Sequence, residues 1–269
     1  MRTKEEKIMN YLEMYYSDYD EDGRLLSRHG QVEYQTTMKY IHQCLGESLD
    51  KRILEVGAGT GRYSVTLAKE GYQVDAVELT SHNLAILKSK LTGNEKCNAI
   101  QGNAMDLSMY EDETFDVTLV LGPMYHLYCS EDKKQVLREA IRVTKKSGYI
   151  LVAYCMNESV IIQEMFVRGH LKEYLDKGLV TEDFKALSCP EELFDMERVE
   201  NIYALTEDLD VDRIHLVATD GATNYMRAIV DAMDDEMFEY WLKYHFATCE
   251  RQDIIGATNH SLDILQKRN

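Results

Sequence analysis

The sequence predicts an α/β fold built on a parallel, doubly wound sheet, and two observations carry this prediction. From residue 51 onward, short apolar runs alternate with segments whose apolar residues recur at helical spacing. A glycine-rich turn at residues 57–61 separates the first apolar run from the first helical segment. Such alternation is typical of parallel strands joined by right-handed crossovers. At 269 residues the chain is long enough for one such domain with a sizeable insertion.

Ahead of the sheet, the N-terminal segment is predicted to be helical. Apolar residues at helical spacing predict helices at residues 4–16 and 31–46, and Gly46 supplies the C-cap of the second. Between them, the acidic run at residues 18–23 imitates the beginning of a calcium loop. The twelfth position of such a loop needs a bidentate glutamate, and here it is His29. We therefore predict a solvated acidic turn and no metal site.

The sheet and its helices follow in order. The predicted strands cover residues 52–56, 73–78, 97–101, 115–121, 149–155, 213–219 and 260–267. The predicted helices of this part cover residues 61–70, 81–91, 130–144, 222–234 and 235–252. Residues 260–267 alternate between apolar and polar, which predicts a partly exposed final strand.

An insertion interrupts the alternation after residue 156. Residues 158–177 have the apolar periodicity of one amphipathic helix, and residues 190–208 are predicted to be helical or irregular. We interpret the chain as one domain with a helical N-terminal cap, a ligand-binding core, inserted lid helices and a segment that completes the sheet. These parts cover residues 1–46, 47–156, 157–208 and 209–269, respectively.

The balance of charge limits the partners. A formal net charge of −17 argues against nucleic acid and an anionic membrane surface, because both require a basic protein surface. The charged residues 1–7 lack the apolar part of a signal peptide, and no apolar run is long enough to span a bilayer. The six cysteines are scattered without metal-ligand spacing, so we expect reduced thiols and a cytoplasmic location.

The spacing of the glycine turn narrows the choice of ligand. Gly57, Gly59 and Gly61 lie between a buried strand and a helix, where backbone N–H groups can hold an anionic group. A dinucleotide site needs its third glycine where this chain has Arg62, and no Gly-Lys-Ser/Thr of a triphosphate loop follows. The spacing therefore disfavours nicotinamide, flavin and triphosphate ligands.

Two further segments are predicted to meet the turn at the same edge of the sheet. Glu78 closes the second strand about twenty residues after the first glycine, where a carboxylate can accept both hydroxyls of a ribose. Residues 102–106 follow the third strand and offer polar groups to an adenine edge. Ligands of open α/β sheets bind outside the carboxyl ends of the strands, where all three segments lie. The sequence thus predicts a nucleoside ligand with a free ribose.

The order of these motifs resembles that of class I S-adenosylmethionine-dependent methyltransferases of the small-molecule type. The resemblance covers residues 50–155 and rests on residues 55–61, Glu78, residues 102–107 and residues 115–122. It implies a Rossmann-like, mostly parallel seven-stranded sheet whose last strand is antiparallel. It also implies an S-adenosylmethionine-dependent methyltransferase that releases S-adenosylhomocysteine, with residues 47–156 as the part that binds the cofactor.

The resemblance further assigns parts of the cofactor to particular residues. The three glycines of the turn are expected to approach its methionine part, Glu78 its ribose hydroxyls, and residues 103–105 its adenine. Many family members have aspartate where this chain has Asn103, but an amide oxygen can still accept a hydrogen bond from the adenine amino group. The predicted cofactor-binding residues are Glu55, Gly57, Ala58, Gly59, Gly61, Glu78, Leu79, Asn103, Ala104, Met105 and Leu121.

The segment after the fourth strand carries the predicted catalytic residues. Gly122 and Pro123 fix a turn from which Tyr125 and His126 project toward the transferred methyl group. Methyl transfer is an in-line displacement, and it needs a base only when the acceptor is protonated. His126 is the predicted base or substrate-orienting group, and Tyr125 is an aromatic wall or hydrogen-bond donor. The alternative, that His126 caps the following helix or satisfies backbone groups, remains open.

Aromatic residues near both ends of the chain are the predicted substrate-binding residues. Tyrosines recur at the end of the first helix, and Trp241, Tyr244 and Thr248 share one stripe of the last helix. Packing against the body of the protein explains each set as well as a roof over the site does. A tyrosine roof favours an enclosed small molecule and suits a cationic acceptor. The predicted substrate-binding residues are Tyr15, Tyr16, Tyr19, Trp241 and Tyr244.

Two other functions remain open from the sequence. A nicotinamide-dependent oxidoreductase uses a similar sheet, although Arg62 occupies the position that its third glycine would need. A non-catalytic regulator could keep the adenosyl site without groups that orient a methyl acceptor. The sequence does not predict the acceptor or the oligomeric state.

Overall fold

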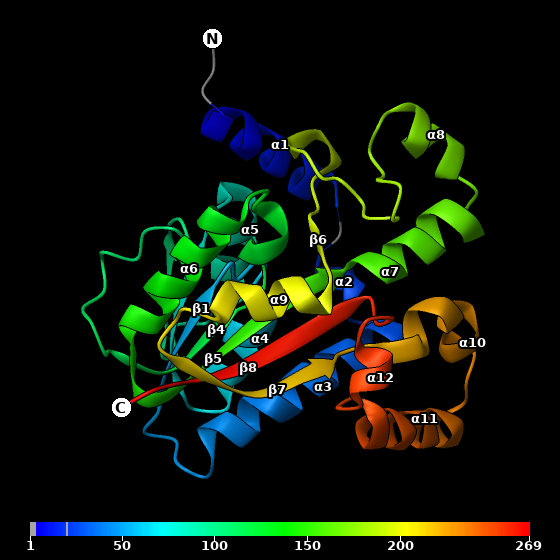
Figure 1. Cartoon of the computed structure of the whole chain (residues 1–269). Coiled ribbons are helices and arrows are strands. Elements are labelled where there is room, and N and C mark those ends of the chain that lie inside the picture. Colours follow the sequence, from blue (N-terminus) through cyan, green and yellow to red (C-terminus); the bar gives the residue numbers. More distant parts are fainter. Residues whose placement is uncertain (1–3, 20) are drawn as a thin grey trace.

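The computed structural model describes residues 4–19 and 21–269. At its centre is one sheet in which seven strands follow the order β3-β2-β1-β4-β5-β8-β7 and a short β6 pairs with β5. The strands are β1 (Arg52–Val56), β2 (Gln73–Glu78), β3 (Cys97–Gln101), β4 (Phe115–Val120), β5 (Thr144–Met156), β6 (Met196–Glu197), β7 (Val211–Ala218) and β8 (His260–Lys267) (Figure 1). Among the strands in the described residues, only the pairs that involve β8 are antiparallel. The predicted mostly parallel sheet is therefore confirmed, with β6 as an addition.

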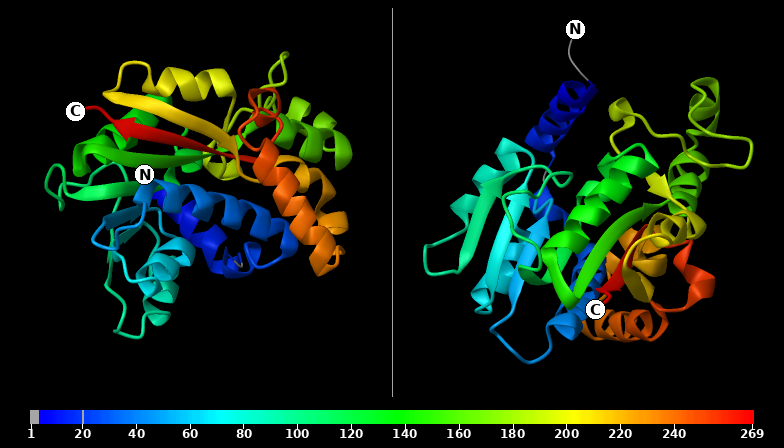
Figure 2. Two further views of the ribbon diagram at one scale, coloured as in Figure 1. Left: turned by 90° about the horizontal axis from the view of Figure 1, so that it is seen from below. Right: turned by 60° about the vertical axis from the view of Figure 1, so that its left-hand side comes forward.

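Helices cover both faces of the sheet (Figure 2). On one face, α3 (Arg28–Leu45) and α4 (Arg62–Lys69) share a hydrophobic core with β1, β4, β5 and β8. On the other face, α6 (Ser130–Val143) and α9 (Val199–Thr206) share a second core with β4, β5, β7 and β8. Successive side chains of β5 enter different cores, Leu151 the first and Val152 the second. Burial on both faces explains why the sequences of the central strands are continuous apolar runs.

Local signals set the ends of α3, the longest helix of the N-terminal cap. The Ser27 hydroxyl accepts a hydrogen bond from the backbone N–H of Gly30 at 3.2 Å and caps the first turn. Gly46 ends the helix with a φ of +65°, which an L side chain rarely adopts. Tyr40 and Ile41 on its inner face are fully buried. The predicted helix is present and begins three residues earlier, at Arg28.

The remaining helices frame the two ends of the sheet. The N-terminal cap adds α1 (Lys4–Asp18) and α2 (Glu21–Arg24), and α5 (Ser81–Ser89) packs beside α1. Apart from the helices that begin the insertion after β5, the other helices are η1 (Pro123–His126), η3 (Pro190–Glu192), η4 (Gly221–Met226), α10 (Arg227–Asp231), α11 (Asp235–Thr248) and α12 (Gln252–Ile255). Among the described residues, no helix combines the length and apolar character needed to cross a membrane.

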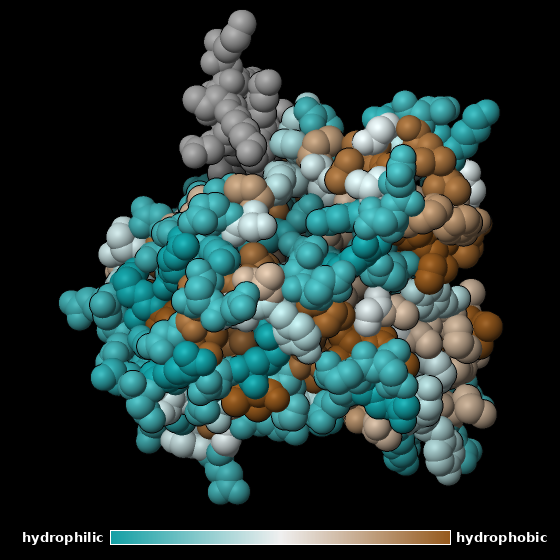
Figure 3. All heavy atoms as spheres, viewed as in Figure 1, coloured by the Kyte–Doolittle hydropathy of each residue, from teal (hydrophilic) through white to brown (hydrophobic). Residues whose placement is uncertain are grey.

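The insertion after β5 differs from the single amphipathic helix predicted over residues 158–177. It begins with α7 (Asn157–Val160), continues as a π-helical segment, η2 (Ile161–Val167), and resumes as α8 (Leu171–Asp176). Gly169, with a φ of +79°, lies in the break between the two helical stretches. Several side chains of η2 are exposed, and Figure 3 shows apolar residues gathering over this part of the surface. The prediction of one continuous helix was wrong because apolar residues can keep their helical spacing on both sides of a break.

The last strand also differs from its prediction as partly exposed. Residues 261–265 of β8 are all buried, because the strand lies between β5 and β7 with helices on both faces. The buried polar side chains of β8 have hydrogen-bond partners inside the protein. The Asp263 carboxylate accepts hydrogen bonds from the Arg213 guanidinium at 2.6 and 2.9 Å. The alternation in the sequence therefore reflects paired buried polar groups and not solvent on one face.

Candidate active site

A cavity of about 870 Å³ opens at the carboxyl ends of β1, β2, β3 and β4. Its volume lies in the range of small-molecule sites. The glycine turn, the residues after β2 and β3, η1 and the inner face of α1 form its wall. Ten of the eleven predicted cofactor-binding residues line it, namely Glu55, Gly57, Ala58, Gly59, Glu78, Leu79, Asn103, Ala104, Met105 and Leu121. The structure thus brings together segments that lie far apart in sequence, from Leu12 in α1 to Asp132 in α6.

Gly57 and Gly59 form the floor of this cavity with positive φ angles of +72° and +53°. A Cβ atom on Gly57 would lie 2.6 Å from Cδ of Pro123, so only glycine fits against the turn after β4. Gly61 is the predicted cofactor residue that does not line the cavity. A Cβ atom there would lie 2.6 Å from Cγ of Leu87 in α5, so Gly61 serves the close approach of two helices. Its expected contact with the methionine part of a cofactor does not fit this position.

The Glu78 carboxylate is fixed at the end of β2. One oxygen accepts a hydrogen bond from the N–H of Gly59 at 2.8 Å, and the other accepts from the N–H and hydroxyl of Thr80 at 2.9 and 2.7 Å. A carboxylate oxygen can accept more than one hydrogen bond. Glu78 is therefore held in one orientation beside the glycine turn, and its acceptor role toward ribose hydroxyls stays a prediction.

Asn103 uses its side chain differently from the sequence-based expectation. Its amide oxygen accepts a hydrogen bond from the backbone N–H of Met105 at 3.0 Å and so stabilises its own turn. Ala104 and Met105, which are partly buried, line the same part of the cavity. Residues 103–105 thus line the cavity together, and their contact with adenine, like the hydrogen bond from the Asn103 oxygen, remains a prediction.

Glu55 is a buried carboxyl group beneath the glycine turn. The N–H of Ser64 donates to its Oε2 at 2.8 Å, and the Ser64 hydroxyl also donates to it. These bonds tie the first turn of α4 to β1. Burial nevertheless raises the pKa of Glu55 to about 8, because the charged form loses its hydration. In the ligand-free protein the neutral form is therefore favoured at neutral pH.

The raised pKa of Glu55 predicts a pH-dependent stability. Because the pKa is raised from 4.5 to about 8 on folding, the stabilisation is fully present below pH 4.5. It is lost as the pH rises through about 8. The substitution Glu55→Gln keeps a neutral side chain and should remove this part of the pH dependence. Urea unfolding of both proteins between about pH 5 and 9 tests it, and an equal slope in the variant would contradict the assignment.

Tyr125 and His126 both lie in η1 at the wall of the cavity. The Tyr125 hydroxyl donates a hydrogen bond to the carbonyl oxygen of Leu121 at 2.8 Å, so it serves the turn. Its ring is 5.0 Å from the His126 ring and 5.9 Å from the ring of Phe194, measured between centroids. The structure therefore favours the expected aromatic wall over the expected hydrogen-bond donor.

His126 has a partner at each ring nitrogen. Its Nδ1 is 2.9 Å from the carbonyl oxygen of Leu193, and its Nε2 is 2.9 Å from the hydroxyl of Tyr16. A carbonyl only accepts, so Nδ1 carries the hydrogen. Burial lowers the pKa of His126 to about 4 despite the bond to Leu193, so the imidazole is neutral at physiological pH. Nε2 is then an acceptor, and Tyr16 donates to it. His126 does not cap α6, whose N-cap residue is Cys129.

Residues 193–197 of the insertion, which we call the strap, contact His126 and the residue before it. Leu193 adopts a φ of +64°, an uncommon conformation for a non-glycine residue, and presents its carbonyl to His126. The Asp195 N–H donates to the carbonyl of Tyr125 at 2.7 Å. The buried ammonium of Lys133 pairs with the carboxylates of Asp195 and Glu197. Sequence reasoning missed the strap because residues 190–208 show no periodicity.

A second cavity, of about 430 Å³, adjoins the first. Tyr16, Arg24 and Tyr125 line both. The predicted substrate-binding residues Tyr15 and Tyr19 also line the second cavity, where their rings stack at 5.0 Å. Three of the five predicted substrate-binding residues are thus brought together beside the first cavity.

The other two predicted substrate-binding residues, both on α11, lie elsewhere. Trp241 packs behind the second cavity and donates from its indole nitrogen to the Thr223 hydroxyl at 3.1 Å. Tyr244 is 57% exposed. The buried residues of α11 are Phe238 and His245, so the helix turns a different face inward than predicted. Neither Trp241 nor Tyr244 lines a described cavity, which corrects the expectation.

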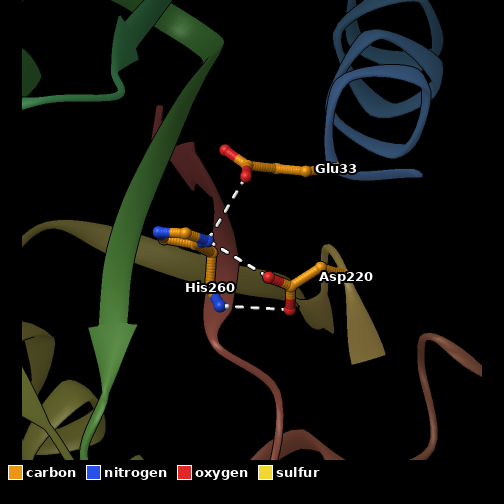
Figure 4. Close-up of side chains that lie close together, drawn as sticks. All are labelled: Glu33, Asp220 and His260. Atoms are coloured by element: carbon orange, nitrogen blue, oxygen red, sulfur yellow. Dashed lines mark hydrogen bonds and ion pairs between the residues drawn. The ribbon is translucent and has the colours of Figure 1, made fainter. Parts of the chain in front are cut away.

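A chain of ionic contacts forms one wall of the second cavity (Figure 4). His260 Nδ1 lies 3.3 Å from a Glu33 oxygen and 3.2 Å from an Asp220 oxygen. Arg24 donates to both Glu33 oxygens at 2.8 and 3.1 Å. Burial alone would lower the pKa of His260, but Glu33 and the other negative neighbours outweigh it and raise the pKa well above its ordinary value.

The same three side chains are close enough to hold a metal ion. One ligand atom each from Glu33, Asp220 and His260 lies within 4.8 Å of the others. Arg24, however, places a permanent positive charge on both Glu33 oxygens, and Asp220 already accepts from the N–H groups of Asn259 and His260. A protonated His260 satisfies this arrangement fully, so these residues fit an ion-pair network better than a metal centre.

The strand order, the glycine turn at the end of β1 and the acidic residue at the end of β2 define the fold of class I S-adenosylmethionine-dependent methyltransferases. Residues 54–152 match the family model described as a methyltransferase domain. Over these residues the chain therefore carries a methyltransferase domain.

Comparisons with known proteins agree with this class. Demethylmenaquinone methyltransferase of Halalkalibacterium halodurans is 34% identical over 159 residues, which cover 55% of this chain and 60% of that one. Glycine/sarcosine N-methyltransferase of Aphanothece halophytica is 26% identical over 182 residues, covering 63% and 66%. A crystal structure of an S-adenosylmethionine-dependent methyltransferase, a possible histamine N-methyltransferase, from Thermotoga maritima shares the fold. Its TM-score is 0.58 at 17% identity, covering 97% of this chain and 100% of that one. The chain spans between 43% and 66% of the length of three curated relatives that it matches.

Proposed function

We propose that the protein transfers a methyl group from S-adenosylmethionine in the first cavity to a small-molecule acceptor in the second. The observation that carries the proposal is the meeting of the two cavities at Tyr16, Arg24 and Tyr125. Displacement at a sulfonium methyl group requires the acceptor on the far side of the methyl carbon from sulfur, in line with the breaking bond. Two adjoining cavities with shared walls provide such an approach.

The enclosure of the site supports a small acceptor. Helix α1 contributes Leu12 and Tyr16 to the first cavity, and the insertion contributes Phe194 and Met196 to the second. We propose that the cap at residues 1–46 and the insertion at residues 157–208 close over the two ligands and exclude water. A volume of about 430 Å³ is at the small end of ligand sites and leaves no room for a folded protein segment or duplex nucleic acid.

The names of relatives support the same acceptor class. They include methyltransferases that are named for demethylmenaquinone and for glycine or sarcosine. The net charge of −17 disfavours nucleic acid and anionic membranes as partners. The six cysteines, all of them free thiols, support a cytoplasmic location.

A transfer screen tests the proposed function. The protein is incubated with S-adenosylmethionine labelled in its methyl group and with pools of small metabolites, peptides and nucleic acids. Label is expected in at least one small molecule, with stoichiometric release of S-adenosylhomocysteine. Label that enters only protein or nucleic acid would contradict the proposal, as would tight cofactor binding without transfer to any small molecule.

A further inference from the structure

We propose that Tyr16 is the side chain that contacts the methyl acceptor, and that the acceptor's nucleophilic atom is a nitrogen or oxygen that carries a hydrogen. This inference rests on the proposed function and deepens it. It assigns His126 to accepting the proton of Tyr16 and the Leu193 carbonyl to orienting His126, whereas the sequence suggested that His126 itself acts on the substrate.

The first step of the argument is the direction of the hydrogen bonds. The Leu193 carbonyl can only accept, so it fixes the hydrogen of His126 on Nδ1. Nε2 then has only a lone pair, and the Tyr16 hydroxyl 2.9 Å away must donate to it. The Tyr16 oxygen has its hydrogen directed at His126. Toward any other group, it can therefore act only as an acceptor.

The second step is the place of Tyr16 between the two cavities. Tyr16 follows Leu12 by four residues on α1, so both side chains lie on one face of the helix. Leu12, which is buried, lines the first cavity, while Tyr16 lines both. The Tyr16 ring meets those of Tyr15 and His126 edge-on at 5.1 and 5.8 Å, which fixes its orientation. Tyr16 thus borders the space through which a methyl group must pass.

The third step is the chemistry that an acceptor-only oxygen permits. A lone pair on the acceptor's nitrogen or oxygen attacks the methyl carbon, the carbon–sulfur bond breaks, and its electron pair stays on sulfur. The hydrogen of the acceptor atom passes to the Tyr16 oxygen while the Tyr16 hydrogen passes to His126 Nε2. The imidazolium then returns a proton to solvent, which its low pKa favours. Charge and protons balance without a further reactant.

Because the Tyr16 oxygen can only accept a hydrogen bond, it also restricts which methyl acceptors can react. An N–H or O–H group donates to the Tyr16 oxygen and is held with its lone pair toward the methyl group. A tertiary amine has no hydrogen to donate and would leave the desolvated Tyr16 oxygen without a donor, and a thioether would turn its second lone pair toward that oxygen. We therefore expect primary or secondary amines, or alcohols and phenols, among the acceptors, and no tertiary amines or thioethers.

The substitution Tyr16→Phe tests the assignment, with Tyr203→Phe as the matched control. Tyr203 lies on α9 outside both cavities, and its hydroxyl donates to the side-chain oxygen of the exposed Gln252 at 3.1 Å. We expect kcat of Tyr16→Phe to fall about a hundredfold with an unchanged Kd for S-adenosylmethionine, because general acid–base groups contribute at least that much. Tyr203→Phe should keep both values. In addition, His126→Gln, which retains an acceptor near Nε2, should restore part of the activity lost in His126→Ala.

The possible results separate this inference from the proposed function. Transfer by Tyr16→Phe within about threefold of the unaltered protein would overturn the role of Tyr16 and leave the methyltransferase activity standing. Efficient methylation of a tertiary amine or thioether by the unaltered protein would overturn the selectivity, and it requires no variant to fold. Absence of transfer by the unaltered protein to every acceptor would instead contradict the proposed function itself.

Discussion

The substitution Gly57→Ala is expected to lower the affinity for S-adenosylmethionine at least about a hundredfold. Gly57 has a φ of +72°, and an added Cβ atom would lie 2.6 Å from Pro123 Cδ and 3.2 Å from the Cα of Gly122. Both neighbours belong to the turn after β4, so neither can move without changing the wall of the ligand site. The backbone of the glycine turn must then shift and displace the wall that the ligand contacts, and a hundredfold loss of affinity corresponds to about 2.7 kcal/mol.

A second glycine separates this effect from backbone strain. Gly93 also has a positive φ, of +90°, but no heavy atom lies within 4 Å of a Cβ atom built there. Gly93→Ala should therefore lose stability through strain of about 1–3 kcal/mol and keep its affinity for the cofactor. Isothermal titration calorimetry on both variants measures the difference. Equal affinities for Gly57→Ala and Gly93→Ala would show that the glycine turn does not touch the ligand.

The substitution Lys133→Met is expected to destabilise the protein by about 3 kcal/mol and to lower turnover. The Lys133 side chain is 2% exposed and pairs with Asp195 and Glu197, which would be left without their cation. Removal of one partner from a buried ion pair costs about 3–5 kcal/mol. Turnover should fall because these carboxylates anchor the strap whose Leu193 carbonyl orients His126. Urea unfolding gives the change in free energy, and the transfer assay gives kcat.

The adjacent lysine provides the control. Lys134 makes an ion pair with Asp208 at 2.7 Å, but 60% of the Asp208 side chain is exposed. Exposed pairs contribute at most about 1 kcal/mol, so Lys134→Met should change stability by less than that and leave kcat unaltered. If both substitutions had the same small effect, the strap would not depend on Lys133.

The parts of the fold that the sequence predicted are those in which one local pattern decides the structure. The predicted strands 52–56, 73–78 and 115–121 are mostly buried, and their observed ends agree with the predicted ends within one residue. The glycine turn and Glu78 were predictable because their spacing follows from the geometry of a strand–turn–helix unit. Their meeting at one edge follows from the parallel sheet.

The parts that the sequence could not predict depend on contacts between distant residues. Glu33, Asp220 and His260 come from three elements of the chain, and no local pattern marks them as neighbours. The strap is held by Lys133, about sixty residues away in sequence, and carries no periodicity of its own. The partner of His126 was likewise hidden, because Tyr16 precedes it by 110 residues. The sequence marked these two residues separately but not as a pair.

The prediction of the inner face of α11 was wrong for a different reason. Trp241, Tyr244 and Thr248 share one stripe at helical spacing, and this stripe was predicted to face inward. The structure instead buries Phe238 and His245, because the helix packs against α3 through that side. Aromatic residues are often half-exposed, so their presence on one stripe does not decide the orientation of a helix.

The central claim is that the cavity beside the glycine turn holds S-adenosylmethionine. Calorimetry of the unaltered protein with S-adenosylmethionine, S-adenosylhomocysteine and NAD tests it most directly, since the three ligands share an adenosine and differ in what is attached to it. We predict saturable binding of both sulfur compounds with one site per chain and no binding of NAD. Binding of NAD without binding of either sulfur compound would contradict the claim and favour an oxidoreductase.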